Sequence, residues 1–461
     1  MIREISRRKC LRLWLCKPEY MGRTKWENRF VLLRFRKKNY MMFLKDLKRF
    51  KMERLYDKLK AYSESDFYAF HMPGHKRNKA LLGIELPYDL DITEIDGFDD
   101  LHHADGILKE EQERAARVFG AEESHFLVNG STAGILSAVM GCTHRGDKIL
   151  VARHCHKSIY HAIYMNGLVP RYVYPEFDIS MHMNGEISKE DVAKALAAEP
   201  DIKAVVIVSP NYDGVVSDVK GIAEVAHSYR IPLIVDEAHG PHFGFHPAFP
   251  GRANDLGADV VINSLHKTLP SLTQTAILHI NGKLANRRRI KKYLDMLQSS
   301  SPSYIFMASL DACVDFLDGK CEEAFELYVE RLQKFREELK PLQHLQILRT
   351  EHYDISKVVI STANANITSP ELADRLRKEY HLEMEMTGGT YVLAMTTVAD
   401  TQEGLDRLKA ALLEIDDQLE AKTAVSGSIE ISGELPRLEQ YFTPQEAAER
   451  EEDGEAEEIS W

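Results

Sequence analysis

The feature that most constrains the fold is an alternation of short apolar runs with longer amphipathic segments through the middle of the chain. Seven apolar runs occur, at residues 126–128, 149–152, 169–173, 204–208, 233–235, 260–262 and 276–280. Runs of this length, separated by mostly helical spacers, are typical of buried strands in a parallel sheet that helices cover on both faces. The sequence therefore predicts an α/β fold built on a seven-stranded, mostly parallel sheet.

Beyond about residue 300 the pattern changes and predicts a smaller α+β domain. Its predicted elements are a long helical region at 309–339, strands at 357–361 and 391–395, and helices at 370–380 and 401–419. The domain boundaries that we predict are 1–51 (a basic extension), 52–110 (an N-terminal segment), 111–310 (the large domain), 311–440 (the small domain) and 441–461 (an acidic, solvated tail).

Charge is divided unevenly along the chain. Residues 1–51 contain 17 Lys and Arg against 4 Asp and Glu, whereas residues 52–461 contain 42 against 67. The basic segment has three interpretations: an arm for nucleic acid or an anionic membrane, an organellar targeting segment, or an extension upstream of a natural start at Met41, Met42 or Met52. If the third holds, a chain that begins at Met52 folds and keeps its activity.

The rest of the composition favours a soluble protein of a reducing compartment, which we expect to be the cytoplasm. An acidic body lacks the clustered Lys and Arg that neutralise phosphates, so we expect no nucleic-acid partner. The six cysteines form no C-x-x-C pair. No apolar run approaches the roughly 18 residues that a membrane-spanning helix needs, so we expect no membrane partner.

Lys267 follows the apolar run 260–262, at the end of a predicted strand. Ligands of parallel α/β sheets bind at such ends. Burial there lowers the pKa of an amine, and a neutral amine forms an imine with an aldehyde cofactor. A lysine at a strand end is by itself more often a surface residue, so this interpretation depends on the neighbouring motifs.

Asp236 ends the apolar run 233–235 and is followed by Glu237, Ala238 and His239. A carboxylate at the end of a buried strand is costly unless a cation meets it. The protonated ring nitrogen of pyridoxal phosphate (PLP) is such a cation. Ala238 is small enough to lie under the ring, and His239 can reach the substrate side. The alternatives for Asp236 are a helix cap and a metal ligand.

A phosphate site is predicted where the strand at 126–128 runs into a helix through Gly130, Ser131 and Thr132. Such a turn aims backbone N–H groups and the helix dipole at an anion. Ser and Thr also cap many helices that bind nothing, so the motif is weak alone. Ser264 and His266, beside the lysine, can complete the phosphate site.

His156 lies just past another predicted strand end, where its imidazole can stack on a pyridine ring. Metal binding by His154, Cys155 and His156 is the alternative. Adjacent ligands of this kind lack the spacing of zinc sites, and no second ligand cluster is present in the sequence. We therefore expect no metal.

These elements occur in the order that fold-type I PLP enzymes have, and several motifs resemble one family more closely. The motifs are HMPGHK at 71–76, DDLH at 99–102, FLVNGST at 126–132, DEAH at 236–239 and SLHKTLP at 264–270. They resemble the bacterial Orn/Lys/Arg decarboxylases over roughly residues 52–312. The resemblance implies a fold-type I, PLP-dependent transferase-like large domain with a small C-terminal α+β domain. It also implies a short form without the N-terminal regulatory domain of larger members.

The resemblance also assigns roles. Lys267 would carry PLP as a Schiff base, and residues 52–110 would contribute to the active site. The other implied roles are Asp236 as partner of the ring nitrogen, His156 stacking on the ring, Ala238 beneath it, His239 at the reacting centre, and Ser131, Thr132, Ser264 and His266 on the phosphate. Ser300 would reach the phosphate of a neighbouring subunit, which implies a homodimer or higher homo-oligomer with shared sites.

The implied activity is PLP-dependent decarboxylation of arginine, lysine or ornithine to the corresponding amine or polyamine precursor. The sequence leaves open which of the three is the substrate. A basic side chain needs an acidic partner, and the acids on offer are Glu94, Asp96, Asp99, Asp100, Glu383 and Glu385.

Two other functions remain as alternatives. Another fold-type I reaction, such as transamination or elimination, uses the same cofactor. Transaminases need an arginine for the α-carboxylate, whereas Arg375 and Arg377 lie on a predicted helix. A non-enzymatic protein that binds nucleic acid or a membrane through residues 1–51 is the other alternative.

Overall fold

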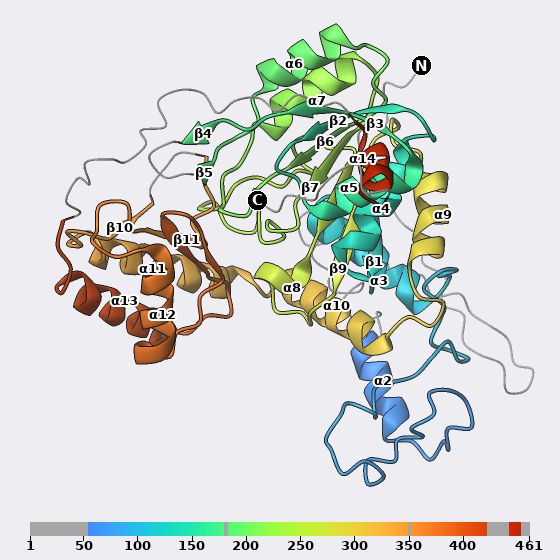
Figure 1. Cartoon of the computed structure of the whole chain (residues 1–461). Helices are drawn as coiled ribbons and strands as arrows, with labels where there is room; N and C mark the ends of the chain where they lie inside the picture. The colour runs from blue at the N-terminus through green and yellow to red at the C-terminus, as the bar shows by residue number, and fades with distance from the viewer. Residues whose placement is uncertain (1–53, 179–182, 349–351, 422–441, 453–461) are drawn as a thin grey trace, which may run out of the picture. The chain divides into compact units, whose positions relative to one another are not determined.

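All seven apolar runs are strands of one sheet in the computed structural model, which describes residues 54–178, 183–348, 352–421 and 442–452. The sheet order is β1-β9-β8-β7-β6-β2-β3 (Figure 1). Strand β9 is antiparallel to both of its neighbours, and the other pairs are parallel. The predicted mostly parallel sheet is therefore confirmed. The strands are β1 (Glu123–Leu127), β2 (Lys148–Ala152), β3 (Val169–Val173), β6 (Val205–Val208), β7 (Leu233–Asp236), β8 (Val260–Asn263) and β9 (Ala276–Ile280).

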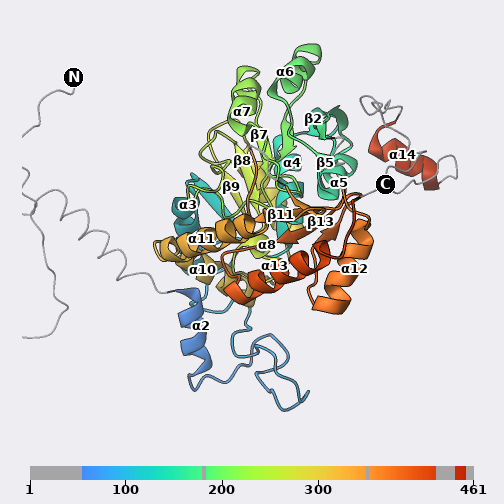
Figure 2. The same cartoon turned by 90° about the vertical axis from the view of Figure 1, so that its left-hand side faces the viewer.

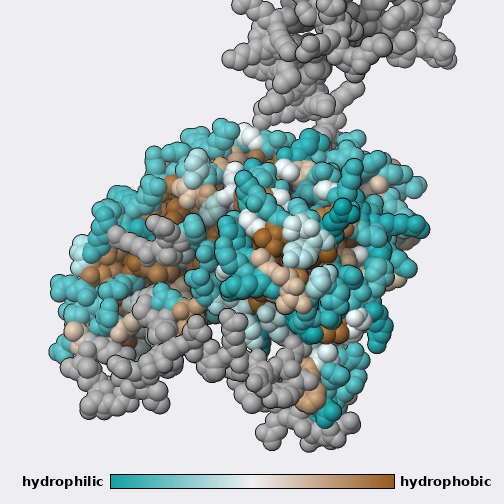
Figure 3. Space-filling view, turned by 90° about the horizontal axis from the view of Figure 1, so that it is seen from above, coloured by the Kyte–Doolittle hydropathy of each residue, from teal (hydrophilic) through white to brown (hydrophobic). Residues whose placement is uncertain are grey.

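Helices cover both faces of this sheet, as strand alternation requires. On β2, Ile149 and Val151 belong to one apolar cluster, while Leu150 and Ala152 belong to another. The first cluster includes α4 (Gly130–Cys142), α5 (Lys157–Asn166) and α9 (Arg287–Leu297), and the second includes α6 (Lys189–Ala198) and α7 (Val219–Ser228). On the outer surface, hydrophilic residues predominate on the face of the molecule shown in Figure 3.

A third apolar cluster joins the sheet to three helices that lie far apart in the sequence. They are α2 (Leu55–Ser63), α3 (Ile107–Phe119) and α10 (Tyr304–Leu317). The guanidinium of Arg114 is buried and pairs with the carboxylates of Glu111 and Asp311. A buried guanidinium needs such partners, because an unpaired one loses its hydration without compensation. This network fixes α3 against α10.

The small sheet has the order β10-β11-β13-β12 and is antiparallel. On β11, Val358 and Ile360 join the apolar cluster that includes the covering helices, and Val359 faces the other side. Figure 2 shows α12 and α13 on the same side of β11 and β13. The elements are β10 (Gln346–Ile347), β11 (Lys357–Ser361), β12 (Met386–Thr387), β13 (Tyr391–Met395), α11 (Glu322–Glu338), α12 (Ser369–Tyr380) and α13 (Gln402–Asp416).

Three details differ from the prediction. The helical region 309–339 is two helices, because the chain turns at Gly319, whose φ of 80° belongs to the left-handed region. A short hairpin of β4 (Phe177–Asp178) and β5 (Met183–Asn184) was not predicted. Within the predicted solvated tail, Pro444–Glu452 forms helix α14, and Thr443 accepts a hydrogen bond from the N–H of Glu446 (3.3 Å). The basic segment 1–51 lies outside the described residues, and the domain boundaries stay a prediction.

Candidate active site

The predicted site residues lie where parallel strands of the large sheet end. Strands β1, β2, β7 and β8 run in the same direction, so their carboxyl ends meet at one edge. Asp236 is the last residue of β7, and Lys267 lies on the short helix α8 (Leu265–Thr268) after β8. Helices α4 and α5 begin after β1 and β2. The fold therefore brings four separate motifs to one edge.

Lys267 and His239 are in direct contact. The Nζ of Lys267 lies 2.8 Å from Nε2 of His239. Burial lowers the pKa of the Lys267 amine, while the charges of Asp236 and Glu385 act in the opposite direction. Burial also lowers the pKa of His239 far below its usual value, helped by the positive charges of Lys357 and Lys267. The geometry thus pairs a neutral imidazole with an amine that loses its proton readily.

Asp236 is a buried carboxylate with few partners. Its Oδ1 accepts a hydrogen bond from the N–H of Ala238 (3.1 Å), and 3% of the residue is exposed. Burial raises the pKa of Asp236, and the charge of Lys267 opposes this. The neighbouring carboxyl of Glu237 is used elsewhere, since it accepts from Asn263 Nδ2 (3.0 Å) and the N–H of Ala253 (2.8 Å). Asp236 is therefore the acid available to a cationic ligand.

The predicted phosphate residues surround the start of α4 and the end of β8. Gly130 has a φ of 72°, which a side chain would strain, and Ser131 and Thr132 follow in the first turn with accessible side chains. The Oγ of Ser264 is buried and has no hydrogen-bond partner among the described residues. The Nδ1 of His266 donates to the carbonyl of Thr275 (2.9 Å), which leaves its other ring nitrogen for a ligand.

His156 is the N-cap of α5. Its Nδ1 accepts from the N–H of Ser158 (3.2 Å) and lies 2.8 Å from the Ser158 hydroxyl, which fixes the ring while leaving the residue exposed. Burial and the charge of Lys267 lower its pKa, so the imidazole lies within electrostatic range of the lysine. In the described ranges, no group of His, Cys, Asp and Glu side chains is arranged to hold a metal ion.

These residues fit PLP. Ser264 Oγ is a buried polar group without a partner, and a phosphate oxygen would satisfy it. The Asp236 carboxylate suits the protonated ring nitrogen, Ala238 leaves room for a flat ring, and Lys267 supplies the amine. The donor set therefore matches the phosphate, the ring and the aldehyde of this one cofactor.

Comparison with known proteins decides the family. Residues 53–365 match the family described as Orn/Lys/Arg decarboxylase, major domain. This chain belongs to the Orn/Lys/Arg decarboxylase family. It is a PLP-dependent decarboxylase of basic amino acids, as the motifs predicted.

Two curated relatives show the extent of the similarity. The arginine decarboxylase of Bacillus subtilis (strain 168) is 34% identical over 409 residues, which cover 85% of this chain and 83% of that protein. The uncharacterized protein YaaO of the same organism is 42% identical over 275 residues, which cover 58% of this chain and 57% of that protein.

Solved structures show the same fold. The lysine decarboxylase LdcF of Francisella novicida and the constitutive lysine decarboxylase of E. coli both superimpose with a TM-score of 0.69, at 19% and 22% identity. The match covers 82% of this decarboxylase but 62% of each of those chains. The predicted fold-type I architecture is thereby confirmed.

The segment around Ser300 lies beside the start of α4 in this decarboxylase. The N–H of Ser299 donates to Oδ1 of Asn129 (3.1 Å), which directly precedes α4, and the carbonyl of Ser299 meets Nε2 of His102 (2.8 Å). Ser300 itself is exposed. Its predicted contact with a neighbouring subunit stays a prediction.

The acids predicted to meet the substrate's basic group differ in their surroundings. Asp99 accepts four backbone N–H groups at the start of α3, and although burial alone would raise its pKa, these bonds hold it below the usual value. Asp100 accepts from the N–H of His102 (2.8 Å). Glu385 accepts from the hydroxyl of Tyr212, and its charge acts on Lys267. Among the six acids, Glu385 therefore has the clearest electrostatic interaction with the candidate active site, because its charge acts on Lys267. We find no such interaction for Glu94, Asp96 or Glu383 in the part of the chain that the structure describes.

Sequence reasoning missed two residues near Lys267. The ring of Tyr212 lies 4.7 Å from that of His239 and follows the end of β6, so the strand-end rule applied to β6 would have found it. Lys357 begins β11, is 0% exposed and has no hydrogen-bond partner for its Nζ among the described residues. A lysine that starts a strand looks like a surface residue, so no sequence signal pointed to Lys357.

Lys357→Met is expected to stabilise the cofactor-free decarboxylase by roughly 2–4 kcal/mol at pH 7. Burial lowers the pKa of Lys357 from 10.5 to about 8. The positive charge of Lys267 also lowers this pKa, whereas the negative charges of Asp354 and Glu385 raise it. At pH values between these two pKa values, the unfolded chain binds more protons than the folded chain. The wild type therefore gains stability as the pH rises through this range. Denaturant unfolding at pH 7 and pH 10.5 measures the free energy of unfolding of the wild type and of Lys357→Met. The variant should be more stable than the wild type at pH 7 alone. An equal difference in the free energy of unfolding at both pH values would contradict a buried charge on Lys357.

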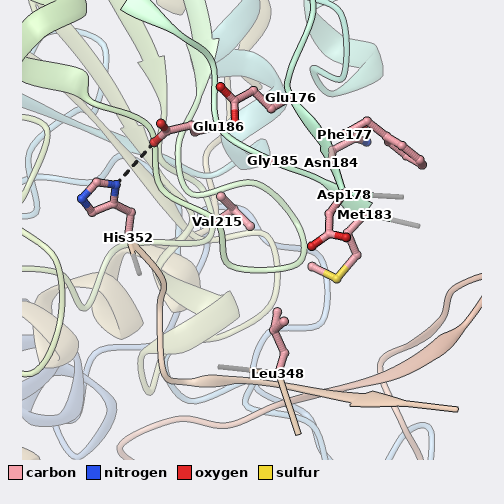
Figure 4. Close-up of a pocket in the computed structure, with 10 residues that line it drawn as sticks. All are labelled: Glu176, Phe177, Asp178, Met183, Asn184, Gly185, Glu186, Val215, Leu348 and His352. Atoms are coloured by element: carbon pink, nitrogen blue, oxygen red, sulfur yellow. Dashed lines mark ion pairs between the residues drawn. The ribbon is translucent and has the colours of Figure 1, made fainter. Parts of the chain in front are cut away.

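A separate cavity of about 430 Å³ lies beside the β4–β5 hairpin (Figure 4). It is lined by Glu176, Phe177, Asp178, Met183, Asn184, Gly185, Glu186, Val215, Leu348 and His352. Nδ1 of His352 lies 3.5 Å from a carboxylate oxygen of Glu186. None of the predicted site residues lines this cavity, so the catalytic assignment does not depend on it.

Proposed function

We propose that the protein decarboxylates arginine, with Lys267 as the residue that carries PLP. The observation that supports this most strongly is the contact between the Lys267 amine and His239 beside the buried carboxylate of Asp236. Arginine is the proposed substrate because curated relatives that match more than four fifths of this chain are named arginine decarboxylases.

When bound, PLP supplies an aldehyde that captures amines and a protonated ring that accepts the electron pair left by departing CO2. Asp236 keeps the ring nitrogen protonated, because a buried carboxylate stabilises a cation next to it. Ala238 and His156 would contact the two faces of the ring. Ser131, Thr132, Ser264 and His266 would bind the phosphate and so fix the position of the whole group.

Lys267 and His239 are paired at the reacting centre. A neutral Lys267 amine is the form that bonds to an aldehyde, and burial favours that form. His239 holds its Nε2 2.8 Å from the amine and is itself neutral. Its Nε2 can therefore accept a hydrogen bond from the Lys267 amine and hold that amine in place beside the reacting centre.

Tyr212 and Glu385 form the proposed recognition site for the basic end of the substrate. The Glu385 carboxylate is exposed, and the Tyr212 hydroxyl donates to it. A carboxylate can bind a guanidinium through two parallel hydrogen bonds, which an ammonium cannot form. This geometry favours arginine over lysine and ornithine.

The test is to supply the purified protein, saturated with PLP, with arginine, lysine and ornithine in turn. We expect CO2 and the matching amine, with arginine giving the highest kcat/KM. A keto acid would show transamination instead, and activity confined to lysine or ornithine would overturn the proposed substrate. No release of CO2 from any of the three would overturn the activity.

We further propose a cytoplasmic homodimer with shared active sites that works in polyamine biosynthesis. The loop before α3 exposes large apolar residues that a second subunit could cover, such as Phe67, Tyr68 and Phe70. In the part of the chain that the structure describes, no helix is long and apolar enough to span a membrane. Light scattering of the purified protein should give twice the chain mass; a monomer that is fully active would contradict shared sites.

A further inference from the structure

Lys357 is a buried cation that nothing in the described chain neutralises by direct contact. It is fully buried, and its Nζ has no hydrogen-bond partner among the residues that the structure places. A buried ammonium without a partner is costly, and folds keep such groups mainly where a ligand pairs with them. The position of this amine therefore calls for an anion.

Strand geometry turns Lys357 away from the helices of the small domain. Val358 and Ile360 pack toward the helices, so Lys357 and Val359 share the opposite face. There the stem of Lys357 packs on the backbone of Gly214: a Cβ placed on Gly214 would lie 2.7 Å from the Cγ of Lys357. Gly214 comes two residues after Tyr212, whose ring contacts His239.

Electrostatic interactions place the amine at the same site. The charge of Lys357 is the strongest of the charges that, after burial, lower the pKa of His239. It also interacts with Lys267 and Glu385. The side chain of Lys357 therefore lies within electrostatic range of the residues at the reacting centre.

The two described acids whose charges act on Lys357 already have other partners. Asp354 is bonded through Oδ1 to Nε2 of His242 (3.1 Å) and the N–H of Ser356 (2.9 Å), and through Oδ2 to the Ser356 hydroxyl (2.7 Å). Glu385 accepts from Tyr212. Within the described ranges neither acid pairs directly with the amine, which leaves it able to pair with the anion of a ligand.

Arg375 and Arg377, the two arginines considered for a carboxylate site, are engaged elsewhere. Arg375 donates to Gln418 (2.7 Å), and Arg377 pairs with Asp374 (2.7 Å), both on exposed parts of α12. An amino-acid substrate brings one carboxylate to the site, and the other charged groups of a basic amino acid are cationic. Among the described residues, the unpartnered amine of Lys357 is a suitable counter-charge for that carboxylate.

We propose that Lys357 Nζ binds the α-carboxylate of the amino-acid substrate. This inference rests on the proposed decarboxylation. The flexible stem of lysine lets the amine reach a ligand without movement of β11. When CO2 leaves, the group that Lys357 holds leaves with it. The amine product then faces an unpaired cation, which promotes its release.

The test compares ligands with and without the carboxylate on the PLP-loaded enzyme. Lys357→Met should raise the KM for arginine by about 10- to 100-fold, the usual loss for a charged hydrogen bond. The inhibition constants of agmatine and argininamide, which lack the carboxylate, should change by no more than about twofold. Lys357→Arg should restore part of the affinity for arginine. Arg377→Met is the control, and it should match the wild type with all three ligands.

The outcomes separate this inference from the activity on which it rests. If the wild type releases no CO2 from arginine, lysine or ornithine, the activity itself is overturned. If the wild type is active and Lys357→Met weakens the binding of arginine, agmatine and argininamide equally, the carboxylate assignment is overturned. It is also overturned if the variant binds all three ligands as well as the wild type does. Thermal melting and cofactor absorbance establish that each variant is folded and loaded, and Lys357→Gln replaces the methionine variant if that one does not fold.

Discussion

Replacing Lys267 with alanine is expected to lower kcat by on the order of 10²- to 10⁴-fold. The variant loses both the amine that bonds to the cofactor and a group that can transfer protons, 2.8 Å from His239. The absorption band of covalently bound PLP should disappear as well. Steady-state rates and the ultraviolet-visible spectrum of PLP-saturated wild type and variant measure the two effects.

Lys378→Ala is the matched control for this experiment. Lys378 lies on α12 and pairs with Asp374 on the surface, so its loss should change neither the spectrum nor the rate. A Lys267→Ala protein that keeps the wild-type spectrum would mean that another amine carries the cofactor.

Asp236→Asn is expected to reduce kcat by roughly 10²- to 10⁴-fold. Breaking a buried ion pair by removing one partner costs about 3–5 kcal/mol, and each 1.36 kcal/mol is a factor of ten. Asparagine keeps the size of the side chain but cannot hold the ring nitrogen in its protonated form. The cofactor should still bind covalently to Lys267, so the loss falls on turnover and not on the content of bound PLP.

Glu237→Gln tests whether the charge at position 236 is specific. Glu237 is buried one residue away, and burial raises its pKa to about 8, so it is largely protonated at neutral pH. A neutral glutamine there should leave kcat nearly unchanged. Equal losses in Asp236→Asn and Glu237→Gln would contradict the pairing of Asp236 with the ring nitrogen.

The sequence predicted the sheet well because each strand is a short apolar run that helices bury on both faces. The runs at 169–173 and 276–280 coincide with β3 and β9. The direction of β9 was not visible, because an antiparallel strand inside a parallel sheet has the same apolar composition. The break at Gly319 was missed because amphipathic periodicity continues on both sides of it.

The strand-end rule brought out much of the candidate site, because parallel strands carry their ligand-binding residues at one edge. Asp236, Lys267, His156 and the start of α4 were predicted in this way. Lys357 could not be, because it comes from the small sheet and only the three-dimensional packing brings it within electrostatic range of His239. Asp99 has a structural role that was not predicted: its carboxylate accepts the N–H groups of Gly106 and Leu108 at the start of α3.

The attachment of PLP to Lys267 is tested by reducing the PLP-loaded wild-type protein with borohydride and locating the modified lysine by peptide mass spectrometry. We expect the cofactor to be trapped on the peptide that contains Lys267, with no label on the peptide that contains Lys357. Label on a different lysine, or no label after saturation with PLP, would contradict the attachment to Lys267.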